Sequence, residues 1–401
     1  MNIGRRYQFN RMEFAGSLGD LGTLLPLAIG LIFVNGLSPS GLFLSVGLYY
    51  ILSGLYFGVT VPVQPMKIIG AYAVATAMSA NQVLASGVMM GLLLLIIGVT
   101  GAVTLIGKYI PKSVIRGVQL STGILLMVGG VQFMIGTSKF QMLQQMAEPY
   151  LTIQSLGPIP IGILLGLIGC VLVFMLIENR KFPAALLLVV GGIAVGLLLG
   201  THEGVDQLRI GFSLPQILPL GLPSGVDFAF AFFALVLPQI PMTLGNAVVA
   251  YVDLSKEYFP DNSRKVTYKS ACISMAVANF LSFILGGMPL CHGAGGLAAH
   301  YRFGARTGGS NLIIGVIFVL LATFLGNHVL MVVKLLPMSI LGVLLLFAGG
   351  QLALTLIDSK ERKDLFVALI MLGITLASNL AAGFIVGIAI AYALKWDRLN
   401  I

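Results

Sequence analysis

MPLCHGAGG, residues 288–296, and VPVQPMK, residues 61–67, place prolines and polar groups inside otherwise apolar regions of the chain. Backbone that leaves regular structure within a membrane must find hydrogen-bond partners in the protein or line a cavity. We therefore expect two broken membrane segments, each consisting of a short extended run followed by a half-helix. The two helix starts are predicted to face each other near mid-membrane and to hold an anion.

The composition excludes a soluble globular protein. Hydrophobic residues make up 58% of the 401 residues and charged residues 9%, whereas soluble domains carry about 25% charged residues. Met1 to Arg11 is polar and basic, so we expect no cleaved signal peptide. Cys170, Cys272 and Cys291 lie far apart and outside any CxxC pattern, which predicts neither a disulfide framework nor a metal site. No cofactor is expected.

Fourteen membrane segments are predicted for this all-α, polytopic chain. Two are the broken segments at 60–80 and 287–301, which are the third and the tenth. The others approach the roughly 17 to 25 apolar residues that cross a bilayer. They are 14–35, 41–59, 84–107, 114–136, 158–177, 184–200, 226–252, 268–286, 310–330, 335–356, 364–379 and 382–395.

The distribution of basic residues predicts the orientation of the chain. Cytoplasmic connections of membrane proteins are enriched in Lys and Arg. With both termini in the cytoplasm and fourteen crossings, 19 of the 23 Lys and Arg residues fall on the cytoplasmic side. The net charge of +9 is then explained by membrane orientation, and no nucleic-acid partner is expected. The exceptions are Lys67, Lys139, Arg209 and Lys334.

An inverted repeat is predicted from the same count. Seven segments in each half is an odd number, so the second half enters from the opposite side, as in many secondary transporters. The spacing agrees, because Asp20 precedes Gln64 by 44 residues and Asn246 precedes Cys291 by 45. The parts are a first repeat at 1–200, an extracytoplasmic connection at 201–225 and a second repeat at 226–401.

The two half-helix starts are the predicted anion site. Pro65 suits the first turn of a helix, so the first half-helix is expected to begin near Gln64. Each start carries roughly half a positive charge and unpaired N–H donors, and Lys67 adds about one charge. Together they balance a small dianion. The predicted binding residues at the two starts are Gln64, Met66, Lys67, Gly293, Ala294 and Gly295.

Neighbouring segments supply further candidates. Gln239, Thr243 and Asn246 are spaced to share one helix face in segment 8, and His292 adjoins the second half-helix. Asp20, in segment 1, is the coupling candidate because an ionisable group at that depth is a functional candidate by default. Whether Asp20 binds a coupling proton or only orients its neighbours stays open at this point.

Several of these residues have a structural alternative. Lys67 could be paired with Asp20, and His292 could cap its own helix. Thr243 and Asn246 could hydrogen-bond between helices without touching a ligand.

Cys291 beside His292 is similar to a thiol nucleophile with its base. Adjacent residues rarely face each other, and the sequence offers no third partner, so we expect a protein that is not an enzyme.

The chain resembles the molybdate transporter family, a branch of the SulP group of anion carriers. The resemblance covers nearly the whole sequence and implies a core domain of segments 1–4 and 8–11 and a gate domain of segments 5–7 and 12–14. It also implies that the anion lies between segments 3 and 10. The matching motifs are EFAGSLGDLGT at 13–23, PVQPMK at 62–67, PQIPMTLGN at 238–246, MPLCHGAGGL at 288–297 and YRFGAR at 301–306.

We therefore expect a secondary active transporter that imports molybdate across the inner membrane of a bacterium by alternating access. Only residues 395–401 follow the last segment, so a STAS regulatory domain is expected to be absent, as in molybdate transporters of this type. Sulfate and tungstate are related candidate substrates. The alternatives are a sulfate carrier and an uncoupled anion channel, and by analogy with this fold a homodimer is expected.

Overall fold

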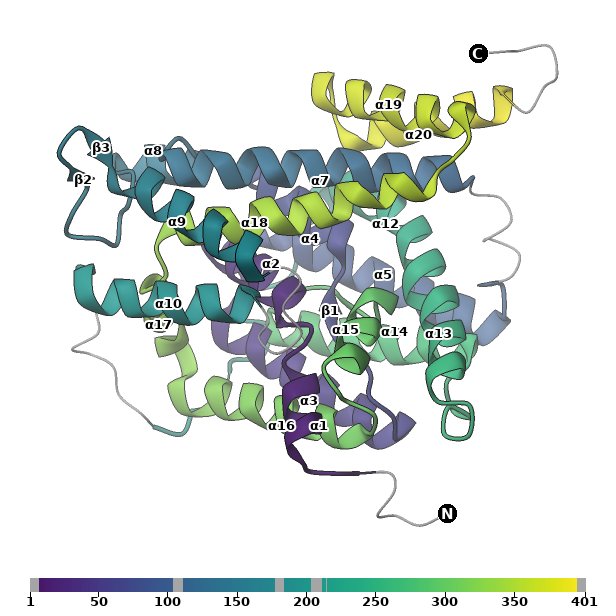
Figure 1. The fold of residues 1–401 in the computed structure, drawn as a ribbon. Helices are drawn as coiled ribbons and strands as arrows, with labels where there is room; N and C mark the ends of the chain where they lie inside the picture. The colour runs from purple at the N-terminus through teal and green to yellow at the C-terminus, as the bar shows by residue number, and fades with distance from the viewer. Residues whose placement is uncertain (1–6, 104–110, 177–183, 203–210, 214, 395–401) are drawn as a thin grey trace.

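The computed structural model describes residues 7–103, 111–176, 184–202, 211–213 and 215–394. The protein is built from helices in layers, with two short strand pairs (Figure 1). The α-helices are α1 (Arg11–Ser17), α2 (Leu21–Phe33), α3 (Pro39–Phe57), α4 (Lys67–Thr76), α5 (Ala80–Thr100), α7 (Lys112–Ile135), α8 (Lys139–Gln144), α9 (Ile161–Leu176), α10 (Ala184–Leu199), α11 (Gly225–Ala231), α12 (Leu237–Met242), α13 (Tyr251–Tyr258), α14 (Tyr268–Leu285), α15 (Ala294–Arg302), α16 (Gly308–Leu320), α17 (Val329–Lys334), α18 (Met338–Ala353), α19 (Arg362–Ala377) and α20 (Leu380–Ala393).

Other helix types and strands complete the element list. The π-helical stretches are η3 (Phe232–Val236), η4 (Thr243–Ala250) and η5 (Leu321–Leu325), and the 3₁₀ stretches are η6 (Gly326–His328) and η7 (Leu354–Asp358). The strands are β1 (Gln64–Pro65), β2 (Ser155–Leu156), β3 (Ile159–Pro160) and β4 (Leu290–Cys291).

The helices identify a polytopic membrane protein. Within the described residues, seven helices are long and apolar enough to cross a membrane, or eight if the bent pair α1 and α2 forms one span. Among the described residues there are four shorter apolar helices: α4, α9 and α10 lie within predicted segments 3, 6 and 7, and α20 overlaps segment 14 but begins two residues before it. The all-α fold is confirmed, while the count of fourteen crossings stays a prediction.

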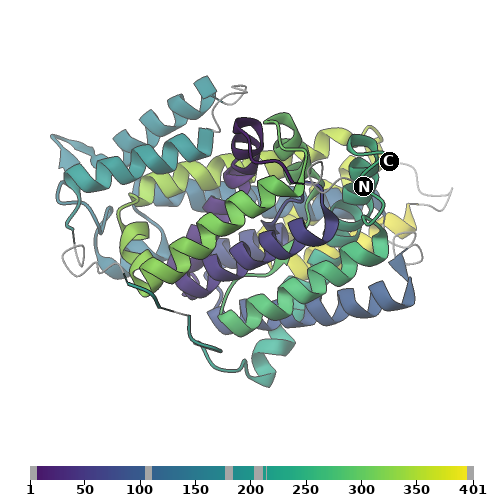
Figure 2. The ribbon, with the colours of Figure 1, turned by 90° about the horizontal axis from the view of Figure 1, so that it is seen from below.

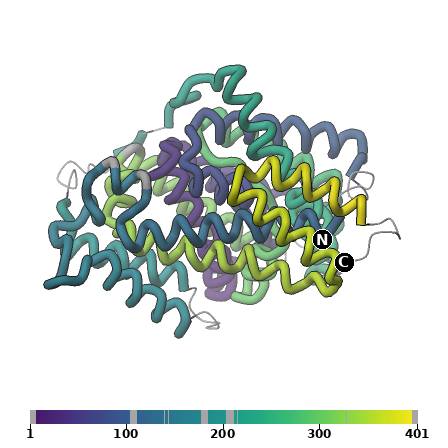
Figure 3. The backbone as a smooth tube through the Cα atoms, turned by 90° about the horizontal axis from the view of Figure 1, so that it is seen from above, coloured from purple at the N-terminus to yellow at the C-terminus, as the bar shows by residue number. Residues whose placement is uncertain are grey.

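Two layers of long helices enclose the centre of the molecule. Seen from below, α16, α3, α14 and α5 lie side by side (Figure 2), and consecutive members of this row pack on each other. Seen from above, α7 lies beside α18, α19 and α20 (Figure 3). The half-helices α4 and α15 lie near the middle of the molecule (Figure 1). The layers therefore place both predicted helix starts inside the protein.

Small residues explain how closely α7 and α18 approach. A Cβ on Gly349 would lie 2.5 Å from the carbonyl oxygen of Gly123, and one on Gly342 would lie 2.5 Å from that of Gly130. A larger side chain at these positions would separate the two helices. Glycine thus allows the backbone contact by which membrane helices pack in the absence of a strong hydrophobic driving force.

The two broken segments meet as an antiparallel strand pair. Gln64 pairs with Cys291 and Pro65 with Leu290, and the N–H of Met66 donates to the carbonyl of Pro289 at 2.8 Å. The predicted start of the first half-helix near Gln64 is therefore wrong by three residues, since α4 begins at Lys67. Pro65 therefore belongs to β1 and not to the helix. The strand pairing needs no N–H at this position, so proline is tolerated there, and the pairing continues to Met66.

Each extended run has one asparagine that satisfies its backbone. The amide of Asn279 accepts from the N–H of Leu290 at 3.1 Å and donates to its carbonyl at 2.9 Å. Asn311 accepts from the N–H of Val61 and donates to its carbonyl, both at 2.8 Å. Both asparagines are buried. These amides replace the neighbouring strand that a sheet would provide, so irregular backbone can persist at this depth.

Candidate anion-binding site

The first turn of α15 is the most open part of the predicted site. Gly293 is its N-cap residue and has extended backbone, and among the described residues no side chain caps this helix. Ala294, Gly295 and Gly296 then begin the helix, so its first N–H groups carry little side-chain bulk. An uncapped helix start attracts anions through these N–H donors and through the helix dipole.

Gln64 and Asp20 cover one side of this turn. A Cβ on Gly293 would collide with Oε1 of Gln64, and one on Gly296 would lie 2.5 Å from Oδ2 of Asp20. Only glycine fits at either position. Nε2 of Gln64 donates to Oδ1 of Asp20 at 2.6 Å. The remaining oxygens, Oδ2 of Asp20 and Oε1 of Gln64, are buried and have no hydrogen-bond partner among the described residues.

Lys67 and Asn246 approach the same turn from two other elements. Nζ of Lys67, from the first position of α4, lies 3.9 Å from where a Cβ of Gly295 would be. Nδ2 of Asn246, from η4, lies 3.5 Å from the corresponding position at Gly293. The structure therefore brings together side chains from both broken segments, from segment 1 and from segment 8.

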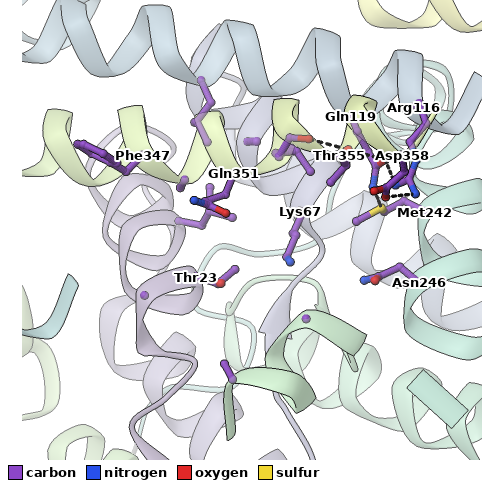
Figure 4. A pocket seen from close by; sticks show the side chains of 18 of the residues that line it. Thr23, Lys67, Arg116, Gln119, Met242, Asn246, Phe347, Gln351, Thr355 and Asp358 are labelled. Carbon is purple, nitrogen blue, oxygen red and sulfur yellow. Dashed lines mark hydrogen bonds and ion pairs between the residues drawn. The ribbon is translucent and has the colours of Figure 1, made fainter. Parts of the chain in front are cut away.

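The ammonium of Lys67 has no bonded partner in the described part of the chain. It makes no ion pair with Asp20, although its charge acts electrostatically on that carboxylate. Figure 4 shows the side chain pointing into a cavity, with Thr23 and Gln351 to one side and Asn246 to the other. The alternative in which Lys67 serves only as the ion-pair partner of Asp20 is therefore not what the structure contains.

Gln239 and Thr243 serve the start of α4. Oε1 of Gln239 accepts from the N–H groups of Ile68 and Ile69 at 3.0 and 3.1 Å, and its Nε2 donates to Thr243 at 2.9 Å. With the N–H of Met66 bonded to the carbonyl of Pro289, the residue before β4, the first turn of α4 is largely satisfied by protein. The two half-helix starts are thus not equivalent, because α4 is capped by an amide and α15 is not.

The helix that carries these residues departs from α-helical geometry. Residues 225–258 form a continuous helix in which α12 stands between the π-helical stretches η3 and η4. Pro238 and Pro241 lie in α12 and lack the N–H groups that an α-helical ladder uses. Such π-helical turns occur frequently at functional sites. Here η4 carries Asn246 to the cavity while α12 carries Gln239 to α4.

His292 faces away from the cavity. Its Nε2 lies 2.6 Å from the hydroxyl of Tyr49, and its Nδ1 lies 2.9 Å from the carbonyl oxygen of Pro62. The ring stacks between Tyr49 and Tyr251 at centroid distances of 5.0 and 5.1 Å. It is fully buried, and it caps none of the described helices. In this conformation His292 anchors the strand before α15.

Cys291 has no acid–base partner in the described residues. Its Sγ lies 3.6 Å from the carbonyl oxygen of Pro65, and both ring nitrogens of the neighbouring His292 are bonded elsewhere. The thiol therefore lacks the adjacent base that a nucleophile requires.

A cavity of about 1150 Å³ adjoins α15 and Lys67. One wall holds Thr23, Lys67, Asn246 and Gly295, and the opposite wall comes from α7, α9, α10 and α18. Three of the predicted binding residues, Lys67, Asn246 and Gly295, line the cavity. The others lie behind the lining, and they are Gln64, Met66, Gln239, Thr243, His292, Gly293 and Ala294. The charged lining residues other than Lys67 belong to helix ends and connections predicted to be cytoplasmic, and they are Lys112, Arg116, Arg302, Asp358, Lys360, Glu361 and Asp364.

Polar residues on the opposite wall were not predicted from the sequence. Gln351 of α18 lines the cavity, as does Gln119 of α7, whose Nε2 lies 2.9 Å from Sδ of Met242. Arg116 of α7 forms an ion pair with Asp358 at 2.6 Å (Figure 4). Polar residues within the apolar segments 114–136 and 335–356 were the available signal.

Comparisons with known proteins agree with this architecture at the level of fold. The chain is similar to the transmembrane domain of the cyanobacterial bicarbonate transporter BicA, with a TM-score of 0.63, 16% identity and coverage of 98% of both chains. It is also similar to SLC26A9, with a TM-score of 0.66, 15% identity and coverage of 96% of this chain and 65% of that chain. The fold is therefore that of SLC26-type transporters.

Sequence comparisons identify the family. Molybdate transporters 1 and 2 of Arabidopsis thaliana are each 30% identical to this chain, covering 96% and 97% of it and 88% of their own lengths. Molybdate transporter 1 of Chlamydomonas reinhardtii is 29% identical over 95% of this chain and 91% of its own. The family model described as "Molybdate transporter of MFS superfamily" matches residues 12–126 and 231–352. The chain therefore belongs to the molybdate transporter family, a family of transporters and not of enzymes.

Proposed function

We propose that this chain is a secondary active transporter that imports molybdate by alternating access. The observation that carries the proposal is the ammonium of Lys67, which has no bonded partner among the described residues and enters the cavity beside the uncapped first turn of α15. A half-buried cation beside uncapped N–H donors suits an oxyanion. The names of the three relatives support molybdate as that oxyanion.

In this proposal the anion contacts α15 more than α4. N–H groups near Gly293, Ala294 and Gly295 donate to the oxyanion, Lys67 supplies charge, and Nδ2 of Asn246 donates from segment 8. Gln64 orients Asp20 beside the same turn. Gln239, Thr243 and Met66 hold the start of α4, which positions Lys67, and His292 fixes the strand before α15.

Asp20 is the proposed coupling residue. A carboxylate beside the first turn of α15 repels a dianion when it is ionised and does not when it is protonated. One of its oxygens has no hydrogen-bond partner in the described residues and is free to take a proton. We propose that a proton accompanies molybdate inward; stimulation of uptake by a sodium gradient instead of a pH gradient would contradict this step.

Transport requires two bodies that move relative to each other. The proposed core contains segments 1–4 and 8–11 of the inverted repeats 1–200 and 226–401, and the proposed gate contains segments 5–7 and 12–14. The cavity reaches residues predicted to be cytoplasmic, so this conformation is proposed to be open to the cytoplasm. We further propose that the protein lies in a cell inner membrane as a homodimer, with fourteen crossings and both termini in the cytoplasm.

Calorimetric titration of the purified protein with molybdate tests the site. Lys67→Ala should weaken binding by roughly 10-fold to 100-fold, as expected for a lost bond to a charged group. Lys256→Ala, which removes an exposed lysine outside the cavity, is the matched control. Wild-type affinity in a folded Lys67→Ala protein would contradict the role of Lys67.

The same titration separates the alternatives. Sulfate binding equal to or tighter than molybdate binding would favour a sulfate carrier with the same site. Tungstate, which is a tetrahedral dianion like molybdate, should compete with it. An anion conductance in a planar bilayer without saturating turnover would favour an uncoupled channel, and absence of binding by either oxyanion would refute the proposed function.

A further inference from the structure

The helix α18 and the η7 turn that follows it present one face to the cavity. Lining residues recur at three- and four-residue spacing along this face, at Leu344, Phe347, Ala348, Gln351, Leu352 and Thr355. Gln351 and Thr355 are the polar members. Thr355 donates to Gln119 at 2.9 Å, whereas Gln351 is exposed and makes no side-chain hydrogen bond to the described residues. The face thus carries one polar side chain without a protein partner.

Gln351 lies across the cavity from the proposed anion site. Figure 4 places its amide near Thr23 and Lys67, with Asn246 farther along the same cavity. Its helix also packs against α2, which carries Thr23. Gln351 therefore stands where the proposed gate meets the proposed core.

Closure of this cavity would remove the amide of Gln351 from water. Burying an unpaired amide is costly, so a closed state needs a partner for it. An oxyanion accepts hydrogen bonds only, and the ammonium of Lys67 donates only, but a glutamine amide does both. One side chain can therefore be satisfied with the site loaded and with the site empty.

We propose that Gln351 is the gate-side ligand of the transported oxyanion. In the loaded, closed protein its N–H donates to an oxygen of the anion that faces away from α15. In the empty, closed protein its carbonyl accepts from Lys67, which allows the carrier to return. This inference rests on the proposed transport of molybdate and adds a contact from the proposed gate, which holds none of the binding residues predicted from the sequence.

Two substitutions at this position test the proposal. Gln351→Leu keeps the size of the side chain without its hydrogen bonds, and Gln351→Glu keeps an acceptor while adding a charge that pairs with Lys67 and repels the anion. Gln132→Leu, on α7 and outside the cavity lining, is the matched control. Each protein is titrated with molybdate in detergent and assayed for labelled molybdate uptake in proteoliposomes.

We expect Gln351→Leu to bind molybdate within about threefold of the wild-type affinity while its uptake falls roughly tenfold or more, as one lost bond to a charged group implies. Gln351→Glu should transport less than Gln351→Leu, and Gln132→Leu should match the wild type. Should Gln351→Leu not fold, Gln351→Met carries the same test, because methionine keeps the length of the side chain without its amide.

Two results would overturn the proposal. The first is wild-type uptake by folded Gln351→Leu. The second is an equal loss for the Leu and Glu variants together with lowered thermal stability, which would show a structural role. Failure of the proposed function is visible separately, because the wild-type protein would then not bind molybdate.

Discussion

Replacing Asn279 with leucine should destabilise the start of α15 from a distance. Asn279 is buried on α14 and bonds both the N–H and the carbonyl of Leu290. Leucine has a similar size and can bond neither group, so two buried backbone groups would lose their partners. Each costs about 1–3 kcal/mol, which gives a loss of about 2–6 kcal/mol in the free energy of unfolding. Thermal unfolding of the purified protein in detergent measures the change.

The design includes a graded variant and a control. Asn279→Asp retains an acceptor for the N–H of Leu290 but loses the donor to its carbonyl. Its stability should therefore lie between that of the wild type and that of Asn279→Leu. Asn262→Leu changes an exposed asparagine in the connection before α14 and should unfold like the wild type. If Asn279→Leu also unfolds like the wild type, the backbone of Leu290 has other partners and the explanation given for the broken segments is wrong.

Two further predictions concern buried acceptors at helix starts. Gln239→Leu should lower stability by about 2–6 kcal/mol, because the N–H groups of Ile68 and Ile69 lose their acceptor; thermal unfolding checks it, and wild-type stability would contradict the capping role. Burial raises the pKa of Glu148 above 4.5, against bonds from Met338 and Ser339 that lower it. Its stabilising effect is then present below about pH 4.5 and lost as the pH rises through the raised pKa, so the wild type should lose stability relative to Glu148→Gln on going from pH 4 to 7. If the difference in stability between the wild type and Glu148→Gln does not change with pH, the raised pKa of Glu148 is contradicted.

Much of the fold could be predicted because the bilayer restricts the backbone. Apolar length indicates crossings, and prolines inside apolar segments indicate where a crossing must break. Placement of the first half-helix failed by three residues because Pro65 fits either a helix start or a strand position without an N–H. Its strand partner, Leu290, lies 225 residues away in sequence. The preference of a residue for helix or strand depends on its sequence neighbours and cannot predict that pairing.

The predicted binding residues divide into those that line the cavity and those that do not, and their role in binding stays a prediction. Lys67, Asn246 and Gly295 line the cavity, and Asp20 and Gln64 meet beside them. Gln239 and His292 could not be oriented from sequence, because helical spacing gives a shared face and not the neighbour that the face meets. Gln239 of segment 8 bonds backbone N–H groups in broken segment 3, and the partners of His292 come from α3, α14 and the run before β1.

The difference between the two half-helix starts bears on how a dianion could be held. An inverted repeat predicts two equal helix ends, but the amide of Gln239 occupies the N–H groups at the start of α4. The open contributions are then one helix end and Lys67, roughly one and a half positive charges. An ionised Asp20 would reduce that sum to about half a charge, too little for a dianion. On this reasoning, the proposed binding of a dianion and the proposed protonation of Asp20 would favour each other, which is the thermodynamic requirement for the proposed proton symport.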